Sequence, residues 1–186
     1  MESKLFTPVT FGPLTLRNRT IRSAAFESMC PGNAPSDMLL DYHRSVAAGG
    51  IGMTTVAYAA VTQSGLSFDR QLWMRPEIIP GLRRLTDAIH AEGAAAGIQL
   101  GHCGNMSHKS ICGCMPVGAS SGFNLYSPTF VRGLRADELP EMARAYGRSV
   151  NLAREAGFDS VEIHAGHGYL ISQFLSPYTN RRTDGY

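Results

Sequence analysis

The sequence has little of the charge imbalance, apolar length or leader composition that marks nucleic-acid-binding, membrane or secreted proteins. Its 17 Lys and Arg residues nearly balance 15 Asp and Glu residues, which leaves a formal net charge of +2. Such a balance argues against a nucleic-acid or membrane-surface partner. No apolar run is long enough to span a bilayer, and residues 1–6 lack the apolar core of a signal peptide. We therefore expect a cytoplasmic protein.

Cysteines are few, and their spacing does not match a zinc site. Three of the four, Cys103, Cys112 and Cys114, follow a C-x8-C-x-C pattern, whereas zinc ligands usually come as C-x-x-C pairs. We expect free thiols in a flexible loop, with a metal cluster there as the less favoured alternative. Cys30 is expected to be buried. Because no secretory signal is present, free cysteines fit a reducing compartment.

Nucleotide-binding signatures are missing as well. The chain contains neither a P-loop nor a G-x-G-x-x-G fingerprint, so a Rossmann dinucleotide site has no support. What the chain does contain is an ordinary globular composition, with 186 residues and 44% hydrophobic content. This length is sufficient for one domain with its own core.

Short β-branched runs alternate with longer helical patterns along the chain. This alternation predicts a parallel sheet with right-handed crossovers. Helical spacing ends at glycines, which are common stop signals. The predicted strands are residues 20–25, 51–57, 95–100 and 160–164, and the predicted helices are residues 38–48, 76–92 and 137–156.

The connections point to a β/α barrel. The helix-to-strand junctions are short, whereas the strand-to-helix loops are long, and residues 101–136 form the longest. Long loops on one side and short turns on the other are typical of a (β/α)8 TIM barrel. Four strands cannot close such a barrel. The predicted fold class is therefore α/β, with residues 1–186 as the first four strands of a TIM barrel; an open doubly wound sheet is the alternative.

His164, His167 and Tyr169 form the most informative group. They follow the predicted strand 160–164 within six residues. At the carboxyl end of a barrel strand, such side chains face the mouth of the active site. Two donors that hold one oxygen, beside an acid that supplies a proton, form a site that can polarise a carbonyl. A zinc site would need a third ligand, and no carboxylate stands at a partner spacing, so we predict no metal. The alternative is a buried, hydrogen-bonded histidine beside a packed tyrosine.

Two further strand ends carry residues suited to a flat ligand. Gln99 ends the third predicted strand, and its amide can both donate to and accept from an imide or pyrimidine edge; it could equally cap a turn. Small residues end the first strand and leave room for a flat cofactor. Tight core packing would need the same small residues, which are Ser23, Ala24 and Ala25, followed by Phe26.

Several segments together resemble the N-terminal half of the Old Yellow Enzyme family of FMN-dependent oxidoreductases. The opening is similar at residues 5–8 (LFTP) and 12–19 (GPLTLRNR), and the third-strand motif at residues 99–102 (QLGH). The longest likeness comprises residues 161–164 (VEIH), 167–170 (HGYL), 173–177 (QFLSP) and 180–184 (NRRTD). The resemblance covers essentially the whole chain.

The resemblance implies a cofactor, a reaction and residue roles. FMN would bind at the carboxyl end of the barrel strands, be reduced by NADH or NADPH, and pass a hydride to an activated alkene. His164 and His167 would hold the substrate carbonyl, Tyr169 would supply a proton, and Gln99 would bind the flavin pyrimidine edge. The residues implied to contact the flavin are Ser23, Ala24, Ala25, Phe26, Tyr58, Gln99 and His164.

The chain departs from the family pattern at two places. Phe26 stands near a position where the family usually has Thr or Cys, and phenylalanine cannot give the hydrogen bond that tunes the flavin. Cys103 and Asn105 replace an alanine and an arginine of the third-strand motif. An iron–sulfur cluster, found in longer members, would lie only beyond this segment. A second hypothesis is a non-catalytic half-barrel fragment or assembly module whose sheet edges are covered by a partner or by a second copy in a homo-oligomer.

Overall fold

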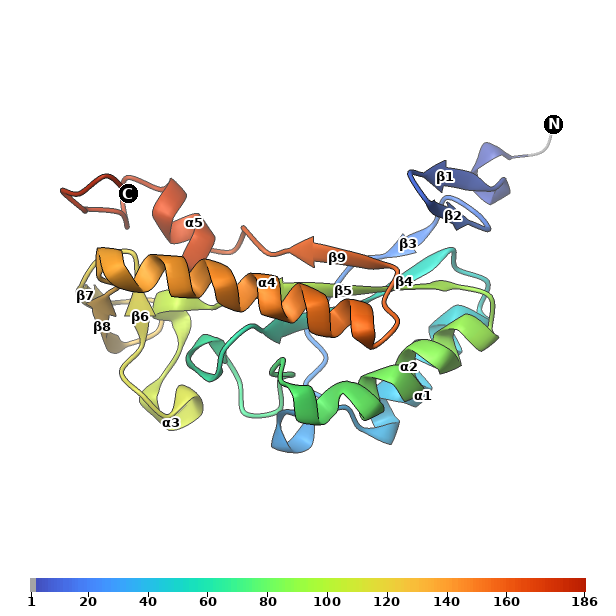
Figure 1. The fold of residues 1–186 in the computed structure, drawn as a ribbon, viewed down its shortest axis with the longest axis horizontal. Coiled ribbons are helices and arrows are strands. Elements are labelled where there is room, and N and C mark those ends of the chain that lie inside the picture. The colour runs from blue at the N-terminus through green and yellow to red at the C-terminus, as the bar shows by residue number, and fades with distance from the viewer. Residues whose placement is uncertain (1–2) are drawn as a thin grey trace.

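The computed structural model describes residues 3–186, so the first two residues of the N-terminal segment considered above lie outside the described residues. Its centre is a four-stranded parallel sheet in the order β3–β4–β5–β9 (Figure 1). The strands are β3 (Ile21–Arg22), β4 (Met53–Ala60), β5 (Ala95–Gly101) and β9 (Ser160–Ile163). All three pairings are parallel, and the strand order follows the chain order, as predicted.

The first strand is shorter than the predicted residues 20–25. Pairing with β4 ends at Arg22, opposite Thr54. Beyond that point side chains hold β4 instead: Nη1 of Arg22 donates to the Thr55 carbonyl at 2.7 Å, and the Ala57 N–H donates to Oε2 of Glu27 at 3.2 Å. Residues 23–28 therefore follow β3 without pairing to β4 as a strand.

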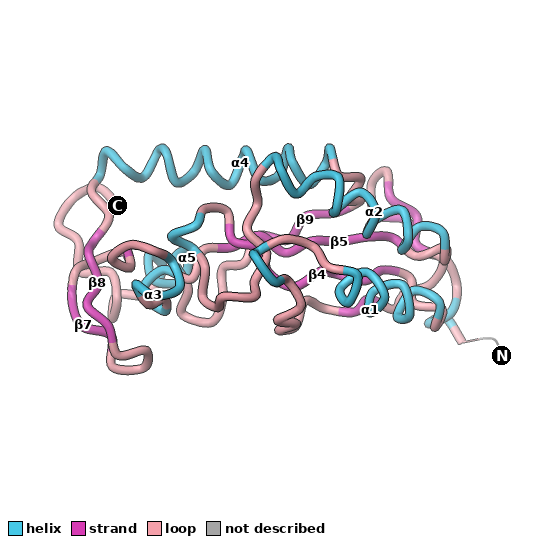
Figure 2. Tube along the Cα trace, turned by 90° about the horizontal axis from the view of Figure 1, so that it is seen from below, coloured by secondary structure: helices cyan, strands magenta, loops and turns pink. Residues whose placement is uncertain are grey.

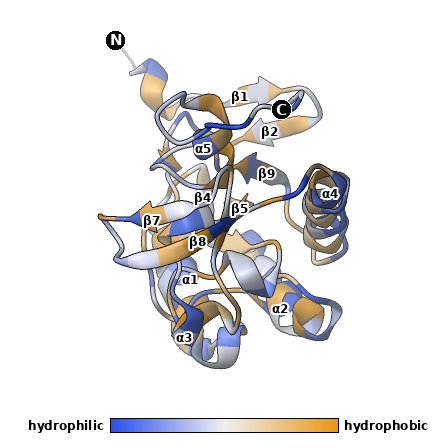
Figure 3. Ribbon diagram, turned by 90° about the vertical axis from the view of Figure 1, so that its left-hand side faces the viewer, coloured by the Kyte–Doolittle hydropathy of each residue, from blue (hydrophilic) through white to orange (hydrophobic). Residues whose placement is uncertain are grey.

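Three helices cover one side of the sheet, as the end-on view shows (Figure 3). They are α1 (Asp37–Ala48), α2 (Ile79–Ala91) and α4 (Leu139–Glu155). The predicted helices at residues 76–92 and 137–156 each begin with a 3-10 turn instead, at Pro76–Ile78 and Ala136–Glu138. α1 begins where Oγ of Ser36 accepts the Leu39 N–H at 3.2 Å. Gly50, Gly93 and Gly157 follow these helices with positive φ, the conformation in which glycine ends a helix most easily.

The main core lies between these helices and the sheet. Leu82, Leu85 and Ile89 of α2 are fully buried, as are Ile98 and Leu100 of β5. Burying each such side chain contributes about 1.5–3 kcal/mol. Figure 2 shows α2 and α4 running alongside β5. Because side chains alternate along a strand, Gln99 points to the opposite face of the sheet from Ile98 and Leu100.

The segment predicted as a loop at residues 101–136 contains structure of its own. It forms α3 (Lys109–Cys112) and a small sheet in the order β6–β8–β7, from Val117–Gly118, Thr129–Gly133 and Gly122–Asn124. An N-terminal hairpin joins β1 (Val9–Phe11) to β2 (Leu14–Leu16), and α5 (Leu170–Leu175) follows β9. Further 3-10 helices lie at Lys4–Phe6, Pro31–Asn33, Gln63–Gly65 and Gly104–Met106.

The four cysteines form no disulfide with one another. Cys30, Cys103 and Cys112 are buried and Cys114 is exposed, all as free thiols. The predicted burial of Cys30 is confirmed. Within residues 3–186, no group of three or more His, Cys, Asp or Glu side chains is arranged to hold a metal ion. No helix in that range is long and apolar enough to cross a membrane.

Candidate active site

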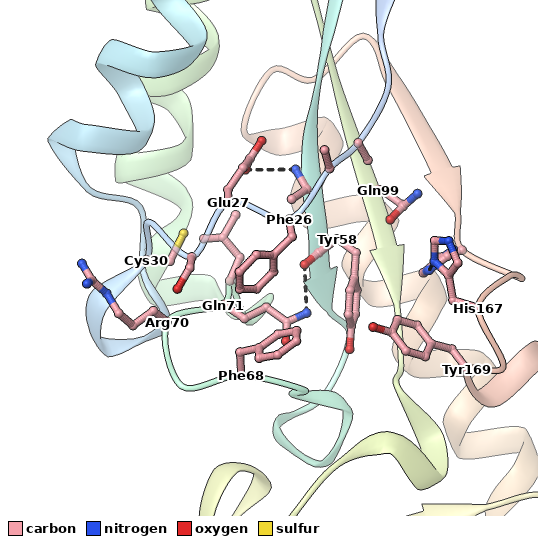
Figure 4. Close-up of a pocket in the computed structure, with 16 residues that line it drawn as sticks. Phe26, Glu27, Cys30, Tyr58, Phe68, Arg70, Gln71, Gln99, His167 and Tyr169 are labelled. Carbon is pink, nitrogen blue, oxygen red and sulfur yellow. Dashed lines mark hydrogen bonds between the residues drawn. The ribbon is translucent and has the colours of Figure 1, made fainter. Parts of the chain in front are cut away.

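A pocket of about 240 Å³ opens at the carboxyl ends of the parallel strands (Figure 4). The segment after β3, the ends of β4 and β5, and the turn after β9 all contribute to it. It brings together every predicted site residue except Ser23. The lining residues are Ala24, Ala25, Phe26, Glu27, Ser28, Cys30, Ala57, Tyr58, Phe68, Arg70, Gln71, Leu72, Gln99, His164, His167 and Tyr169.

The turn after β9 presents His164, His167 and Tyr169 to one space. The His164 N–H donates to the Leu100 carbonyl at 2.8 Å, which ties this residue to the end of β5. His167 and Gly168 both have positive φ, 56° and 68°. Two such residues in succession reverse the chain, so both imidazoles and the phenol approach each other. The ring centroids of His164 and Tyr169 lie 5.0 Å apart.

The two imidazoles are in direct contact, since Nδ1 of His167 lies 3.1 Å from Nε2 of His164. Burial lowers the pKa of His164, and the neighbouring His167 lowers it further. His164 is therefore a neutral imidazole at neutral pH, with one N–H to donate and one nitrogen to accept. Burial raises the pKa of Tyr169, so its phenol keeps its proton at the same pH.

Tyr58 forms the wall opposite this turn. Its hydroxyl donates to the Gly65 carbonyl, and its ring centroid lies 5.4 Å from that of Tyr169. Burial raises the pKa of Tyr58 well above its usual value. Gly101 makes room for this ring, because a Cβ there would lie 2.8 Å from Cδ2 of Tyr58. The hydroxyl of Tyr58 is thus occupied by its own hydrogen bond, and its ring forms one wall of the pocket.

Gln99 and Glu162 are register partners on β5 and β9. Nε2 of Gln99 donates to Oε1 of Glu162 at 2.6 Å. The amide group is thereby oriented, and its oxygen is left to accept a hydrogen bond from a ligand.

A buried ion pair at the pocket, between Glu27 and Arg22, was not predicted. Oε1 of Glu27 accepts from Arg22 at 2.9 Å and contacts Nε2 of His43 at 3.0 Å, and its side chain is 5% exposed. The same carboxylate holds the Ala57 N–H at the end of β4. Glu27 therefore holds the segment after β3 against the end of β4, where both line the pocket. The sequence did offer a sign of this role, because Glu27 is an acid that directly follows the small and apolar residues 23–26.

Two phenylalanines form the outer wall. The ring centroids of Phe26 and Phe68 lie 4.5 Å apart, and the two residues remain 67% and 43% exposed. Phe68 lies in a loop whose approach to residue 26 cannot be deduced from spacing. Exposed aromatic pairs are normally buried when a partner or ligand is available, so this wall suits an apolar or aromatic ligand face.

The sequence of residues 4–186 matches the model of the NADH:flavin oxidoreductase / NADH oxidase family. The chain belongs to this family. It is 43% identical over 182 residues to a 4,4'-dithiodibutanoate disulfide reductase of Rhodococcus erythropolis, covering 98% of this chain and 45% of that protein. It is 38% identical over 188 residues to an NADPH dehydrogenase of Listeria monocytogenes, covering 99% and 54%. The chain thus spans about half the length of the curated relatives it matches.

Family membership also settles the fold. The structure of an Old Yellow Enzyme homologue from Zymomonas mobilis superimposes with a TM-score of 0.90 at 28% identity, covering 98% of this chain and 54% of that one. The predicted resemblance to Old Yellow Enzyme is confirmed. The strands β3, β4, β5 and β9 are accordingly the first four strands of a partial TIM barrel, and the doubly wound alternative is wrong.

The pocket of this family member fits the flat ring of FMN. The methyl groups of Ala24, Ala25 and Ala57 line it and offer no side-chain obstacle to a planar ligand. The free amide oxygen of Gln99 can accept from a ring N–H. His164 stands beside them as a neutral donor. These residues would hold the ring system of the cofactor.

Proposed function

We propose that the protein is an FMN-dependent oxidoreductase that uses NADH or NADPH and reduces a C=C bond conjugated to a carbonyl. The observation that carries this proposal is the cluster of two imidazoles and one protonated phenol around a single pocket. FMN, when bound, would supply the hydride. The side chains of this chain supply the remaining parts of the reaction.

His164 and His167 bind and polarise the substrate carbonyl. Negative charge develops on that oxygen when a hydride is added to the conjugated carbon, and two fixed donors stabilise it most at that moment. A neutral imidazole suits this task because it donates a hydrogen bond without carrying charge into the pocket. The lowered pKa of His164 keeps that ring neutral.

Tyr169 supplies the proton that completes the reduction. Its raised pKa means that the phenol holds a proton at neutral pH and can act as a general acid. Its ring lies against both His164 and Tyr58, so the proton is delivered next to the bound carbonyl. Phe26 and Phe68 add an apolar wall to the same pocket.

A second candidate is a non-catalytic half-barrel or assembly module. The observation that favours it is the sheet itself: among residues 3–186, β3 and β9 each pair with a neighbouring strand on one side only. Exposed strand edges are sites for pairing with another chain. In that case the sheet edges, and not the pocket, would carry the function.

An FMN titration of the 186-residue chain, followed by flavin fluorescence and absorbance, separates the two candidates. The oxidoreductase predicts saturable binding that weakens about tenfold in Gln99→Leu, through loss of one hydrogen bond. Gln63→Leu, outside the pocket, serves as the matched control. With binding established, anaerobic mixing of the reduced protein with 2-cyclohexenone should reoxidise the flavin. Absence of saturable FMN binding by the wild-type protein, or equal binding by Gln99→Leu and wild type, would count against the oxidoreductase site.

A further inference from the structure

Cys112 and Cys114 form a close pair of thiols away from the pocket. Their Sγ atoms lie 3.8 Å apart. Sγ of Cys112 also donates to the Cys114 carbonyl at 3.2 Å. Gly113 between them has a φ of 74° and ends α3, so the chain turns back and directs both side chains to the same point. A disulfide bond requires about 2.05 Å between the sulfurs, and a shift of less than about 2 Å would close it.

The two thiols differ in access. The Cys112 residue is 2% exposed, whereas Cys114 is on the surface. This asymmetry resembles the usual division in dithiol chemistry, where an accessible sulfur is attacked or attacks first and a shielded sulfur resolves the product. Neither residue lines the pocket.

We infer that Cys112 and Cys114 form a redox-active dithiol that is oxidised by small organic disulfides. The thiolate of Cys114 attacks one sulfur of the disulfide RSSR, the S–S bond breaks, and one RS⁻ leaves and takes up a proton. Cys112 then loses its proton, attacks Sγ of Cys114 and displaces the second RS⁻, which is protonated in turn. In total, two protons and two electrons pass from the protein dithiol to RSSR, which becomes two RSH.

The intramolecular disulfide would be easily reversed. A ring closed across a single intervening residue departs from relaxed disulfide geometry, and such departures make the bond more reducible. A soluble dithiol would therefore restore both thiols. This chemistry needs no flavin, so its test does not depend on the function proposed for the pocket.

Reaction of Cys114 should be slow at neutral pH. Burial within the local structure and the neighbouring Cys112 both raise the pKa of its thiol, against a lowering by Arg132. Because the thiolate is the attacking species, the test belongs at mildly alkaline pH.

The experiment treats the full chain with excess 2-hydroxyethyl disulfide and maps tryptic peptides by mass. Both cysteines fall in the peptide of residues 110–132, whereas Cys30 and Cys103 fall in residues 23–44 and 85–109. We expect the first peptide to lose two hydrogens, about 2 Da, as an internal disulfide forms. The other two peptides are internal controls and should keep free thiols, because burial raises the pKa of Cys30 and of Cys103 to about 12.

Two variants test the order of attack. Cys112→Ser should stop at the mixed disulfide on Cys114, and Cys114→Ser should react at least tenfold more slowly than wild type. Cys112→Ala replaces the first variant if the buried serine prevents folding. Retention of both thiols in wild type, or equal modification of Cys30 and Cys103, would overturn the inference. So would adduct formation on Cys112 at the wild-type rate in Cys114→Ser.

Discussion

His167 Nδ1 and His164 Nε2 lie 3.1 Å apart, so the two imidazoles already hydrogen-bond to one another. One nitrogen donates and the other accepts, and the roles depend on the tautomer. A carbonyl oxygen that takes a hydrogen bond from both rings must separate this contact. Ligand binding in the pocket is therefore an exchange of one hydrogen bond for two.

The first prediction concerns this pair. His167→Ala should raise the pKa of His164, because the neighbouring imidazole is the second cause of its lowering after burial. Titration of the His164 ring by NMR measures this directly. The variant should also bind a phenolic carbonyl such as 4-hydroxybenzaldehyde about tenfold more weakly, through the loss of one donor. His90→Ala, which lies outside the pocket, is the control; an unchanged His164 titration would contradict the coupling.

The second prediction concerns Tyr169. Replacement by phenylalanine removes the proton donor but keeps the ring that packs on His164. Alkene reduction should slow by about 10²–10⁴-fold, the usual contribution of general acid catalysis, while reduction of bound flavin by the nicotinamide is unaffected. Stopped-flow measurement of the two half-reactions in the FMN-bound protein separates them. Tyr178→Phe is the matched control, since Tyr178 is 70% exposed and lies outside the pocket. Equal loss in both half-reactions would exclude the proposed role.

The third prediction concerns acid stability. His102 is fully buried; its Nδ1 accepts the Gly104 N–H at 3.0 Å and its Nε2 contacts Oγ of Ser64 at 3.1 Å. Burial lowers its pKa from 6.5 to about 4. The unfolded chain therefore binds a proton more readily than the folded one, and the free energy of unfolding falls as the pH drops from about 6.5 to about 4, by about 3 kcal/mol.

Urea unfolding at several pH values tests this expectation. The amide of His102→Gln can still form hydrogen bonds but does not titrate. In this variant, the slope of the free energy of unfolding against pH between about 4 and about 6.5 should decrease by up to the equivalent of one bound proton. Equal slopes for wild type and variant would show that His102 does not hold a lowered pKa.

The fourth prediction concerns Gly104. Its φ is +64°, and a Cβ there would lie 2.6 Å from Oε1 of Gln173. That amide cannot move aside, because its Nε2 donates to the Gly168 carbonyl at 2.7 Å and to Oδ1 of Asn105 at 2.9 Å. Gly104→Ala should lower the free energy of unfolding by about 2–4 kcal/mol. Gly122→Ala, with no atom within 4 Å of the added Cβ, should change it by less than about 0.5 kcal/mol. Chemical denaturation compares them, and similar losses in both would contradict the packing argument.

The parallel sheet and its helices were predictable because the sequence patterns that indicate them extend over many residues. Helical spacing in residues 79–91 and 139–155 and glycines after each helix carry enough periodicity to fix the elements. The small sheet in residues 117–133 was not predicted. Its strands are two to five residues long, too short for alternation to appear, and they pair with one another rather than with the main sheet.

The candidate site was predictable where strands end, and less so where the chain leaves the sheet. Gln99 and His164 lie where strand alternation and barrel geometry place them. Ser23 does not line the pocket and Glu27 does, since the backbone after Arg22 no longer follows a strand and Ser28 adopts a φ of 52°. Side-chain directions in such a segment depend on contacts with β4 that spacing alone cannot supply.

The agreement between strand order and chain order has a consequence for how the molecule forms. In the order β3–β4–β5–β9, each strand joins the edge left by the one before it. Because domains begin to fold from the N-terminus during synthesis, β3, β4 and β5 can assemble as soon as they emerge, together with α1 and α2. The pairing of β5 with β9 must wait for the 58 residues between Gly101 and Ser160, and loop closure of that length is the slower step. We therefore expect the part of the pocket formed by β4, β5 and the segment after β3 to be in place before His164 and His167 join it.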